Sequence, residues 1–223
     1  MRLLSTKILR AAFKDRLIQH GFTVVEYPFI KISPQNYTPF PLNTHLIFTS
    51  QNAVKFAFEH PNLYTKMKGK NCFCVGEKTK SILEENGQKV IKMTQNAHDL
   101  AHFLIKNYKN ERFSFLCGQR RRPEIEAILH QHKMELTVHE LYTTTLTSKH
   151  FEIPFDGILF FSPSAVESYF AENDWSKKTH GFCIGETTSE SLSKFTNAYS
   201  IAKSPSEAQL LLILKAFYNL NYV

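Results

Sequence analysis

The chain has 223 residues and a formal net charge of +7, with 27 Lys and Arg against 20 Asp and Glu. Hydrophobic residues make up 43% and charged residues 21%, which excludes a disordered chain and a small disulfide-dependent scaffold. No apolar run approaches the roughly 18 residues of a membrane span, and Met1 to Leu4 are followed too soon by polar residues for a secretory signal. We therefore expect a soluble cytoplasmic protein of one large or two small domains, without a membrane partner.

The excess positive charge predicts an anionic partner. Lysines are scattered over the whole length, and the single basic cluster is Arg120-Arg121-Arg122. Nucleic-acid binders usually concentrate such charge in a stripe or an arm, and no zinc finger or aromatic-basic RNA motif is present. An acidic small molecule is favoured over a nucleic acid.

In the first half of the chain, short apolar runs of strand length alternate with stretches of helical period. Leu9, Phe13 and Leu17 recur every four residues and are followed by Gly21, which predicts a helix and its C-terminal cap. A second apolar stripe begins at Ala97. The strands are expected at residues 3–4, 23–25, 46–48, 72–75 and 90–91.

The second half continues the alternation and closes with an apolar helical stripe that begins at Ala208. Strands are expected at residues 113–116, 136–138, 158–161 and 182–184, with a weaker one at 199–201. Alternating strands and helices of this kind predict βαβ units and parallel sheets.

An internal repeat relates the two halves. Thr49-Ser50-Gln51-Asn52-Ala53-Val54 corresponds to Phe161-Ser162-Pro163-Ser164-Ala165-Val166, 112 residues later, and an apolar run precedes each segment. Phe73-Cys74-Val75-Gly76-Glu77-Lys78-Thr79 corresponds to Phe182-Cys183-Ile184-Gly185-Glu186-Thr187-Thr188, 109 residues later. The chain is therefore expected to contain two copies of one plan.

Two extended segments, near residues 28–36 and 139–148, occupy matched positions and look like connections between two lobes. We expect an α/β fold of two parallel-sheet lobes joined by a two-stranded connection, with the active-site cleft between the lobes. Lobe 1 would be discontinuous, formed by residues 1–32 and 148–223, and lobe 2 would span residues 33–147.

Ligands of open α/β sheets bind where strands end and helices begin, so the loops at these points are candidates. Nearly all of them offer hydroxyls, small residues and backbone N–H groups, which suit carboxylate or phosphate oxygens. For any single loop, the simpler interpretation is that its Ser or Thr only caps the following helix. The candidate loops are 5–7, 49–51, 76–79, 118–120, 162–164 and 185–188.

Dedicated cofactor and metal motifs are missing from the sequence. None of the 8 glycines forms a G-x-G, a P-loop or a G-x-S-x-G elbow. Cys72 and Cys74 share one side of a strand without a partner pair and are expected in the core, and all four cysteines are expected to be reduced. His98 and His102 have metal-ligand spacing on a helix, but a solvated face is the better interpretation. We expect neither a metal nor a cofactor.

The order and spacing of these motifs resemble the uroporphyrinogen-III synthase family over essentially the whole chain. The resemblance is carried by Leu46-Ile47-Phe48-Thr49-Ser50-x-x-Ala53-Val54, Val75-Gly76-x-x-Thr79, Cys117-Gly118-x-x-x-Arg122, His139-Glu140-Leu141-Tyr142, Phe160-Phe161-Ser162-Pro163-Ser164-Ala165-Val166, Ile184-Gly185-x-Thr187-Thr188 and Ser204-Pro205-Ser206-x-x-x-Leu210.

By that resemblance, the enzyme is a cyclising hydro-lyase of tetrapyrrole and heme biosynthesis. Its substrate is hydroxymethylbilane, a linear tetrapyrrole with eight carboxylates, and its product is uroporphyrinogen III. Ring D loses its hydroxyl to give an azafulvene, and closure through a spirocyclic pyrrolenine inverts that ring. The resemblance implies no cofactor. We expect a monomer that contacts the preceding pathway enzyme transiently.

The resemblance also implies roles for individual residues. Tyr142 matches the family tyrosine that assists loss of hydroxide, so Tyr142 is the catalytic candidate. Lys7 stands where many relatives carry an arginine, and it keeps the charge but not the bidentate geometry. The expected substrate-binding residues are Lys7, Thr49, Ser50, Gln51, Gly76, Gly118, Arg122, Ser162, Ser164, Thr187 and Thr188.

Two other functions remain open from the residues themselves. A two-lobed transferase with a phosphorylated substrate would also use basic helix N-termini, although the chain has only four Asp residues for a metal. A two-lobed sensor could close on an anion without reacting. The isomer formed from hydroxymethylbilane distinguishes the three functions.

Overall fold

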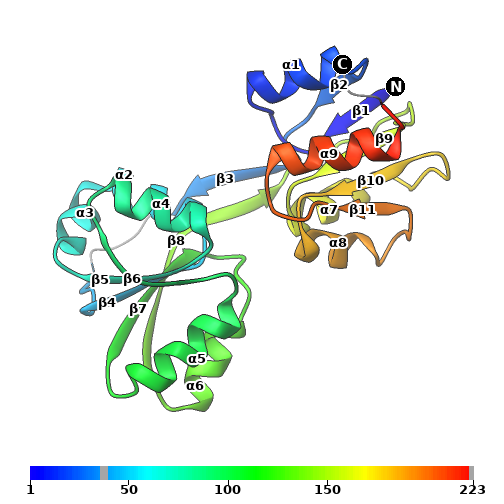
Figure 1. Ribbon diagram of the computed structural model, residues 1–223. Helices are drawn as coiled ribbons and strands as arrows, with labels where there is room; N and C mark the ends of the chain where they lie inside the picture. The colour runs from blue at the N-terminus through cyan, green and yellow to red at the C-terminus, as the bar shows by residue number, and fades with distance from the viewer. Residues whose placement is uncertain (36–39, 221–223) are drawn as a thin grey trace. The chain divides into compact units, whose positions relative to one another are not determined.

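The computed structural model describes residues 1–35 and 40–220 (Figure 1). The chain divides into two compact units, Met1–Lys31 with Thr145–Val223 (unit 1) and Ile32–Thr144 (unit 2). Residue 36, the end of the first expected connection, lies outside the described residues. No helix of the described segments has both the length and the apolar character needed to cross a membrane.

Unit 1 contains a five-stranded sheet in the order β11-β10-β9-β1-β2, and every neighbouring pair is parallel. The central strands are buried because they are apolar along their whole length, as expected of strands covered on both faces. The strands are β1 (Arg2–Ser5), β2 (Thr23–Glu26), β9 (Gly157–Phe160), β10 (His180–Cys183) and β11 (Tyr199–Ile201).

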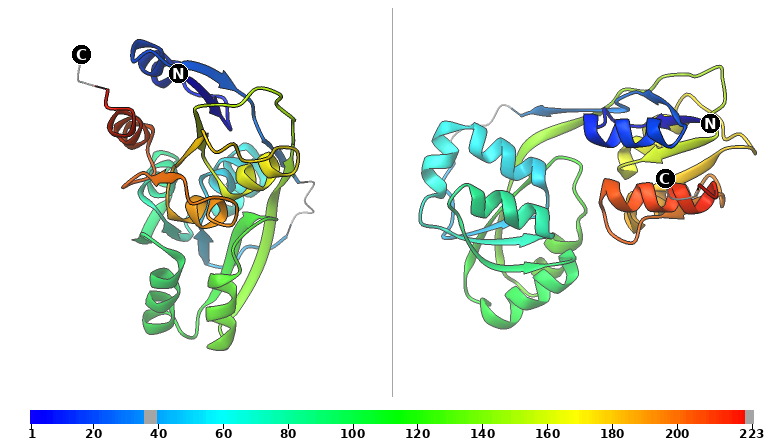
Figure 2. Two further views of the ribbon diagram at one scale, coloured as in Figure 1. Left: turned by 90° about the vertical axis from the view of Figure 1, so that its right-hand side faces the viewer. Right: turned by 45° about the horizontal axis from the view of Figure 1, so that its top comes forward.

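Helices cover both faces of the unit 1 sheet (Figure 2). Successive side chains of a strand point to opposite faces of the sheet. Leu3 therefore packs with α1 and α9, whereas Leu4 packs with α7 and α8. The result is a three-layer α/β/α unit. The helices are α1 (Ala11–Gln19), α7 (Pro163–Phe170), α8 (Glu186–Leu192) and α9 (Glu207–Phe217).

Unit 2 contains a six-stranded sheet in the order β3-β8-β7-β4-β5-β6. The pairs from β8 to β6 are parallel. The strands are β3 (Ile30–Pro34), β4 (His45–Phe48), β5 (Asn71–Val75), β6 (Lys89–Thr94), β7 (Arg112–Gly118) and β8 (Glu135–Leu146).

Two groups of helices pack on opposite faces of the unit 2 sheet. The first group is α2 (Gln51–Glu59), α3 (Pro61–Met67) and α4 (Glu77–Glu85), and the second is α5 (Ala97–Asn107) and α6 (Glu124–Gln131). Cys72 and Cys74 lie in the core under the first group, while Phe73 between them lies under the second. The prediction that both thiols share one face of their strand is confirmed.

The internal repeat corresponds to the two sheets. The order β11-β10-β9-β1-β2 of unit 1 is matched by β6-β5-β4-β7-β8 of unit 2, to which β3 is added. Each sheet therefore combines the first two strands of one copy with the last three strands of the other. This exchange explains why unit 1 is discontinuous in the sequence.

Strands β3 and β8 are neighbours in the unit 2 sheet. The Thr147 N–H donates to the Phe29 carbonyl and the Gln35 N–H to the Leu141 carbonyl, both at 2.9 Å, so the two segments run in opposite directions. The boundaries between the units fall within these strands, at residues 31/32 and 144/145. The two-stranded connection and the cleft it was expected to frame stay predictions.

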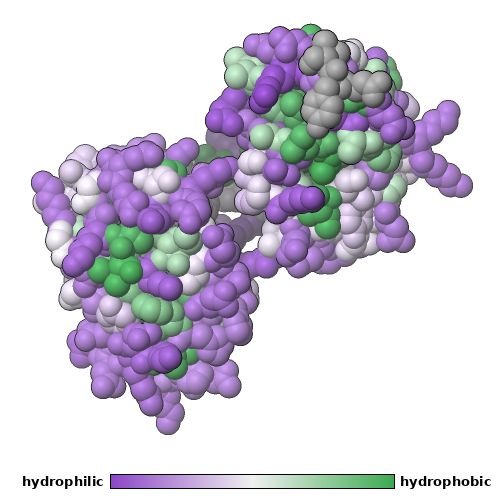
Figure 3. Space-filling model, in the orientation of Figure 1, coloured by the Kyte–Doolittle hydropathy of each residue, from purple (hydrophilic) through white to green (hydrophobic). Residues whose placement is uncertain are grey.

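Hydrophilic residues dominate the faces of the two units that Figure 3 draws. Hydrophobic surface is visible over α9, a helix in which Leu212 and Phe217 are exposed. The side of α9 that packs on the sheet is formed by other residues, the buried Leu210, Leu211 and Leu214.

Candidate functional site

A pair of hydroxyl groups lies at the carboxyl end of the unit 2 sheet. Ser50 follows β4 and caps α2, where its Oγ accepts a hydrogen bond from the Asn52 N–H at 3.2 Å. The Tyr142 hydroxyl, from β8, lies 2.9 Å from the Ser50 Oγ, and either group can be the donor. Strands β4 and β8 are not neighbours, because β7 lies between them.

Gly118 allows Tyr142 to reach across β7. The register of β7 and β8 shifts between Cys117 and Gly118, so that Gly118 is the partner of Tyr142. A Cβ atom on Gly118 would lie 2.4 Å from the Tyr142 ring, closer than any side chain tolerates. Gly118 was expected in a ligand-binding loop, whereas it is the last residue of β7 and provides the space for the Tyr142 ring.

Tyr142 is held in a mostly apolar environment. The residue is 8% exposed and its ring stacks on Phe56 at 5.5 Å between centroids. Burial raises the pKa of the Tyr142 phenol above its ordinary value, although hydrogen bonds with Ser50 and Asn52 act in the opposite direction. Tyr142 is therefore a neutral hydrogen-bond donor at neutral pH.

The other expected residues of unit 2 are more dispersed. Thr49 is partly exposed and Gln51 is the exposed first residue of α2. Gly76 caps α4 with a φ of 85°, a conformation that favours glycine. Arg122 is exposed, whereas its neighbour Arg121 is largely buried.

Arg121 is the arginine that organises this loop. Its guanidinium contacts Glu126 of α6 and Glu140 of β8, each at 2.5 Å. The carboxylate of Glu126 raises the pKa of Arg121, which stays charged. These ion pairs of Arg121 were not predicted from the sequence, and the binding role expected of Arg122 stays a prediction.

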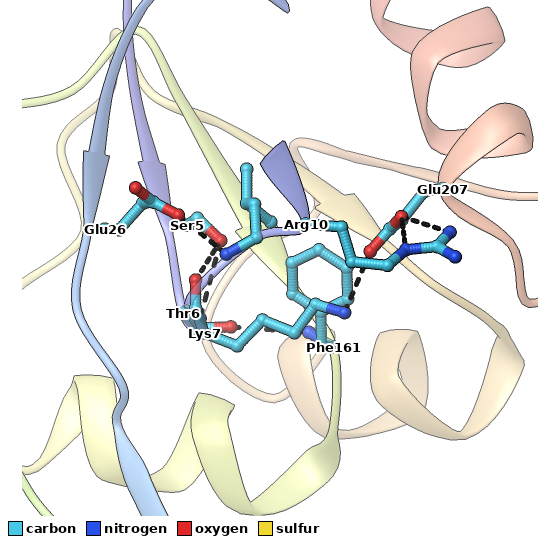
Figure 4. Close-up of polar contacts among 8 residues, drawn as sticks. Ser5, Thr6, Lys7, Arg10, Glu26, Phe161 and Glu207 are labelled. Carbon is cyan, nitrogen blue, oxygen red and sulfur yellow. Dashed lines mark hydrogen bonds and ion pairs between the residues drawn. The ribbon is translucent and has the colours of Figure 1, made fainter. Parts of the chain in front are cut away.

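In unit 1, the loop after β1 carries a charged cluster (Figure 4). The Lys7 Nζ lies 3.1 Å from Glu207 Oε1 and 4.3 Å from the centre of the Phe161 ring. The Arg10 Nε donates to Glu207 Oε2 at 2.7 Å. Lys7 was expected from the sequence, whereas Arg10 and Glu207 were not, because they are 197 residues apart in the chain.

Glu207 is a buried carboxylate at the start of α9, 9% exposed. Burial alone would raise the pKa of Glu207, but hydrogen bonds from Arg10 and Lys7 outweigh it and hold the pKa below the ordinary value. The carboxylate also lies in the first turn of a helix, where negative charge is favoured.

A second acid fixes the backbone of the same loop. Glu26, at the end of β2, accepts a hydrogen bond from the Leu9 N–H at 2.6 Å and contacts Lys14 of α1. Burial opposes ionisation of Glu26, but these two donors lower its pKa. The segment from Lys7 to Arg10 is therefore held by Glu26 and Glu207.

The remaining loops of unit 1 act largely as helix starts. Ser162 caps α7 by accepting the Ala165 N–H at 3.2 Å, and Ser164 is partly exposed within that helix. Thr187 is exposed in the first turn of α8. Thr188, expected in a ligand-facing loop, lies instead within α8 and is 1% exposed, because it is on the face of the helix that packs on the sheet.

The structure thus brings Ser50, Gly118 and Tyr142 together in unit 2 and gives Lys7 two unexpected neighbours in unit 1. Among the described residues, no group of three or more His, Cys, Asp or Glu side chains is placed to hold a metal ion. The Nε2 atoms of His98 and His102 lie 3.1 Å apart on the exposed face of α5.

Comparison with known proteins identifies the family. A family model described as "Uroporphyrinogen-III synthase HemD" matches residues 11–211. The fold is similar to that of uroporphyrinogen-III synthetase from Helicobacter pylori, with a TM-score of 0.70 and 18% identity over 97% of this chain and 100% of that one. No curated protein matches the sequence.

A mutant uroporphyrinogen III synthase from the extremely thermophilic bacterium Thermus thermophilus also has a similar fold, with a TM-score of 0.70 and 15% identity over 99% of this chain and 100% of that one. At these identities the likeness establishes the two-lobed α/β fold, and the family model establishes the relationship. The chain belongs to the uroporphyrinogen-III synthase family and is an enzyme of tetrapyrrole synthesis.

Proposed function

We propose that this chain is a lyase that converts hydroxymethylbilane into uroporphyrinogen III, with loss of water and inversion of ring D. The observation that carries the proposal is the family model, which matches residues 11–211. The proposal includes a cytoplasmic monomer that receives its substrate through a transient contact with the enzyme that makes it.

The carboxylates of the substrate would bind at the carboxyl ends of the two sheets. Lys7 offers positive charge, and hydroxyls and backbone N–H groups lie at the helix starts. The proposed binding residues are those expected from the sequence. Gly118 and Thr188 are buried, so they would act by positioning the residues next to them. An octa-anion also accounts for the net charge of +7.

Tyr142 would assist departure of the ring D hydroxyl. In this step the carbon–oxygen bond breaks with the electrons of the pyrrole nitrogen forming the new exocyclic double bond, and the pyrrole N–H proton is also lost, so that hydroxyl and proton leave together as one water and a neutral azafulvene remains. The raised pKa of Tyr142 favours hydrogen-bond donation over complete transfer of its proton. If Ser50 donates to the Tyr142 oxygen, then the phenol proton is available to the leaving oxygen.

Closure of the tetrapyrrole ring would rely mainly on the position in which the enzyme holds the two reacting ends of the substrate. Holding reacting groups in the correct geometry supplies roughly 7–11 kcal/mol in favourable cases, so a site with one tyrosine and several anion-binding loops is sufficient. The enzyme must also prevent direct closure, which gives the uninverted isomer.

Isomer analysis tests the proposal. Hydroxymethylbilane is generated by the preceding enzyme, the purified chain is added, and the products are oxidised and separated. We expect the type III isomer in excess, and type I alone would contradict the proposal. The transferase and sensor alternatives both predict type I alone, and no separate observation favours either of them.

A further inference from the structure

Glu207 uses both of its carboxylate oxygens on two cations of the loop after β1. Oε1 accepts from the Lys7 Nζ at 3.1 Å, and Oε2 accepts from the Arg10 Nε at 2.7 Å and lies 2.5 Å from a terminal guanidinium nitrogen of Arg10 (Figure 4). One carboxylate therefore fixes the positions of two positive groups that the chain brings from the opposite end of its sequence.

Burial within this cluster is unequal. The side chain of Glu207 is 10% exposed, whereas those of Lys7 and Arg10 are 42% and 79% exposed. An ammonium has three N–H donors and a guanidinium has five, so Glu207 leaves part of each group able to donate to a further acceptor. The anion is thus enclosed and the cations face solvent.

The cations are also held from other directions. The Phe161 ring centre lies 4.3 Å from the Lys7 ammonium, a distance suited to a cation–π contact. Glu26 accepts the Leu9 N–H, which fixes the backbone between Lys7 and Arg10. Such preorganisation lowers the entropic cost of binding an anion to two flexible side chains.

We propose that Glu207 is a positioning residue that presents Lys7 and Arg10 as a paired site for two carboxylates of the substrate. This inference rests on the proposed function, and it adds Arg10 and Glu207 to the binding residues. The cluster of Lys7, Arg10 and Glu207 keeps a net charge of +1, so it still attracts an anion.

Glu207→Gln distinguishes positioning from simple attraction by the direction of the change in KM. The substitution raises the net charge of the cluster to +2, so attraction alone would lower KM. If Glu207 positions the cations, then KM for hydroxymethylbilane rises about three- to tenfold while kcat stays within about twofold. Glu207→Asp, which keeps the charge, should restore part of the affinity.

A double-mutant cycle makes the test specific. Lys7→Met should raise KM less in the Glu207→Gln background than in the wild-type chain, because the ammonium is no longer held in place. The matched control is Glu85→Gln, which removes an exposed acid from the last turn of α4, at the opposite end of that helix from Gly76, and should leave KM unchanged.

Thermal unfolding is measured for every variant, and kinetics are recorded below the transition. A lower KM, an unchanged KM with reduced thermal stability, or additive effects of Lys7→Met and Glu207→Gln would each overturn the inference. The isomer assay distinguishes failure of this inference from failure of the proposed function, because in the second case the wild-type chain would yield no type III isomer.

Discussion

Ser50 in unit 2 and Ser162 in unit 1 occupy equivalent positions of the internal repeat. Each follows a buried strand and caps the next helix, accepting a backbone N–H at 3.2 Å. Ser50 alone of the two also contacts a tyrosine, because Tyr142 crosses over Gly118 from β8. The helix cap is thus common to both copies, whereas the surrounding side chains differ.

The ends of β1 and β7, which are equivalent in the repeat, also carry different side chains, although the loop after β7 has its own charged cluster around Arg121. The loop after β1 in unit 1 carries Lys7 and Arg10 around a buried carboxylate. The equivalent end of β7 in unit 2 carries Gly118 and the neutral phenol of Tyr142. Under the proposed function, unit 1 would contribute Lys7 and Arg10 to binding of the substrate carboxylates, and unit 2 would contribute the phenol that acts on the leaving oxygen besides its own binding loops.

The largest expected effect comes from Tyr142→Phe. Loss of the hydroxyl should lower kcat about a hundredfold with little change in KM, since the donor acts mainly as charge develops on the leaving oxygen. Tyr169→Phe removes the hydroxyl of a buried tyrosine in unit 1 and should leave kcat within about twofold. An unchanged kcat in Tyr142→Phe would remove Tyr142 from the mechanism.

Gly118→Ala should disturb the same site through packing. The new methyl group would lie 2.4 Å from the Tyr142 ring, and the ring must move. Overpacking of this kind costs about 1–3 kcal/mol of unfolding free energy, measured by denaturant titration. In a Tyr142→Ala background the cost should nearly vanish, and an equal cost in both backgrounds would contradict the steric explanation.

An effect of comparable size on the unfolding free energy separates the two repeated glycines, Gly76 and Gly185. Gly76→Ala should reduce the unfolding free energy by roughly 1–3 kcal/mol, because its φ of 85° is strained for alanine. Gly185 has a φ of 179°, which any residue adopts, and its Cβ would meet nothing within 4 Å. Gly185→Ala should therefore change stability by less than about 0.5 kcal/mol, and similar losses at both positions would refute this distinction.

The smallest effect concerns the two acids of unit 1. The folded-state pKa values of Glu26 and Glu207 are lowered from 4.5, so their stabilising contribution is present above pH 4.5 and is lost as pH falls through the folded values. Unfolding free energy, measured from about pH 6 down to about pH 3, should fall less steeply in Glu26→Gln than in the wild-type chain. Parallel curves would contradict this assignment.

Local patterns were sufficient to predict much of the fold. Apolar strands and capped helices follow from short stretches of sequence, so the strands near 46–48 and 158–161, the cap at Ser50 and the internal repeat were all recognisable. The weaker expectation at 199–201 is also confirmed as β11. Hydroxyl-rich loops at strand ends follow from the same local signals.

The candidate site depended more on tertiary structure. Tyr142 was identified by resemblance to the family. Its contact with Ser50, however, depends on the shifted register of β7 and β8 and on the space that a glycine leaves at position 118. The ion pairs of Arg121 were not predicted, because only the folded loop decides which of the neighbouring arginines meets Glu126 and Glu140.

The sequence by itself determined two copies of a βαβ plan, buried cysteines and an excess of positive charge, since each depends on composition or on near neighbours. Only the tertiary structure decided that β7 and β4 are neighbours in one sheet, that Tyr142 reaches Ser50 and that Glu207 holds Lys7 and Arg10. The physical reason is that such pairings join segments far apart in the chain, 200 residues for Lys7 and Glu207, where no local pattern records which side chains will meet.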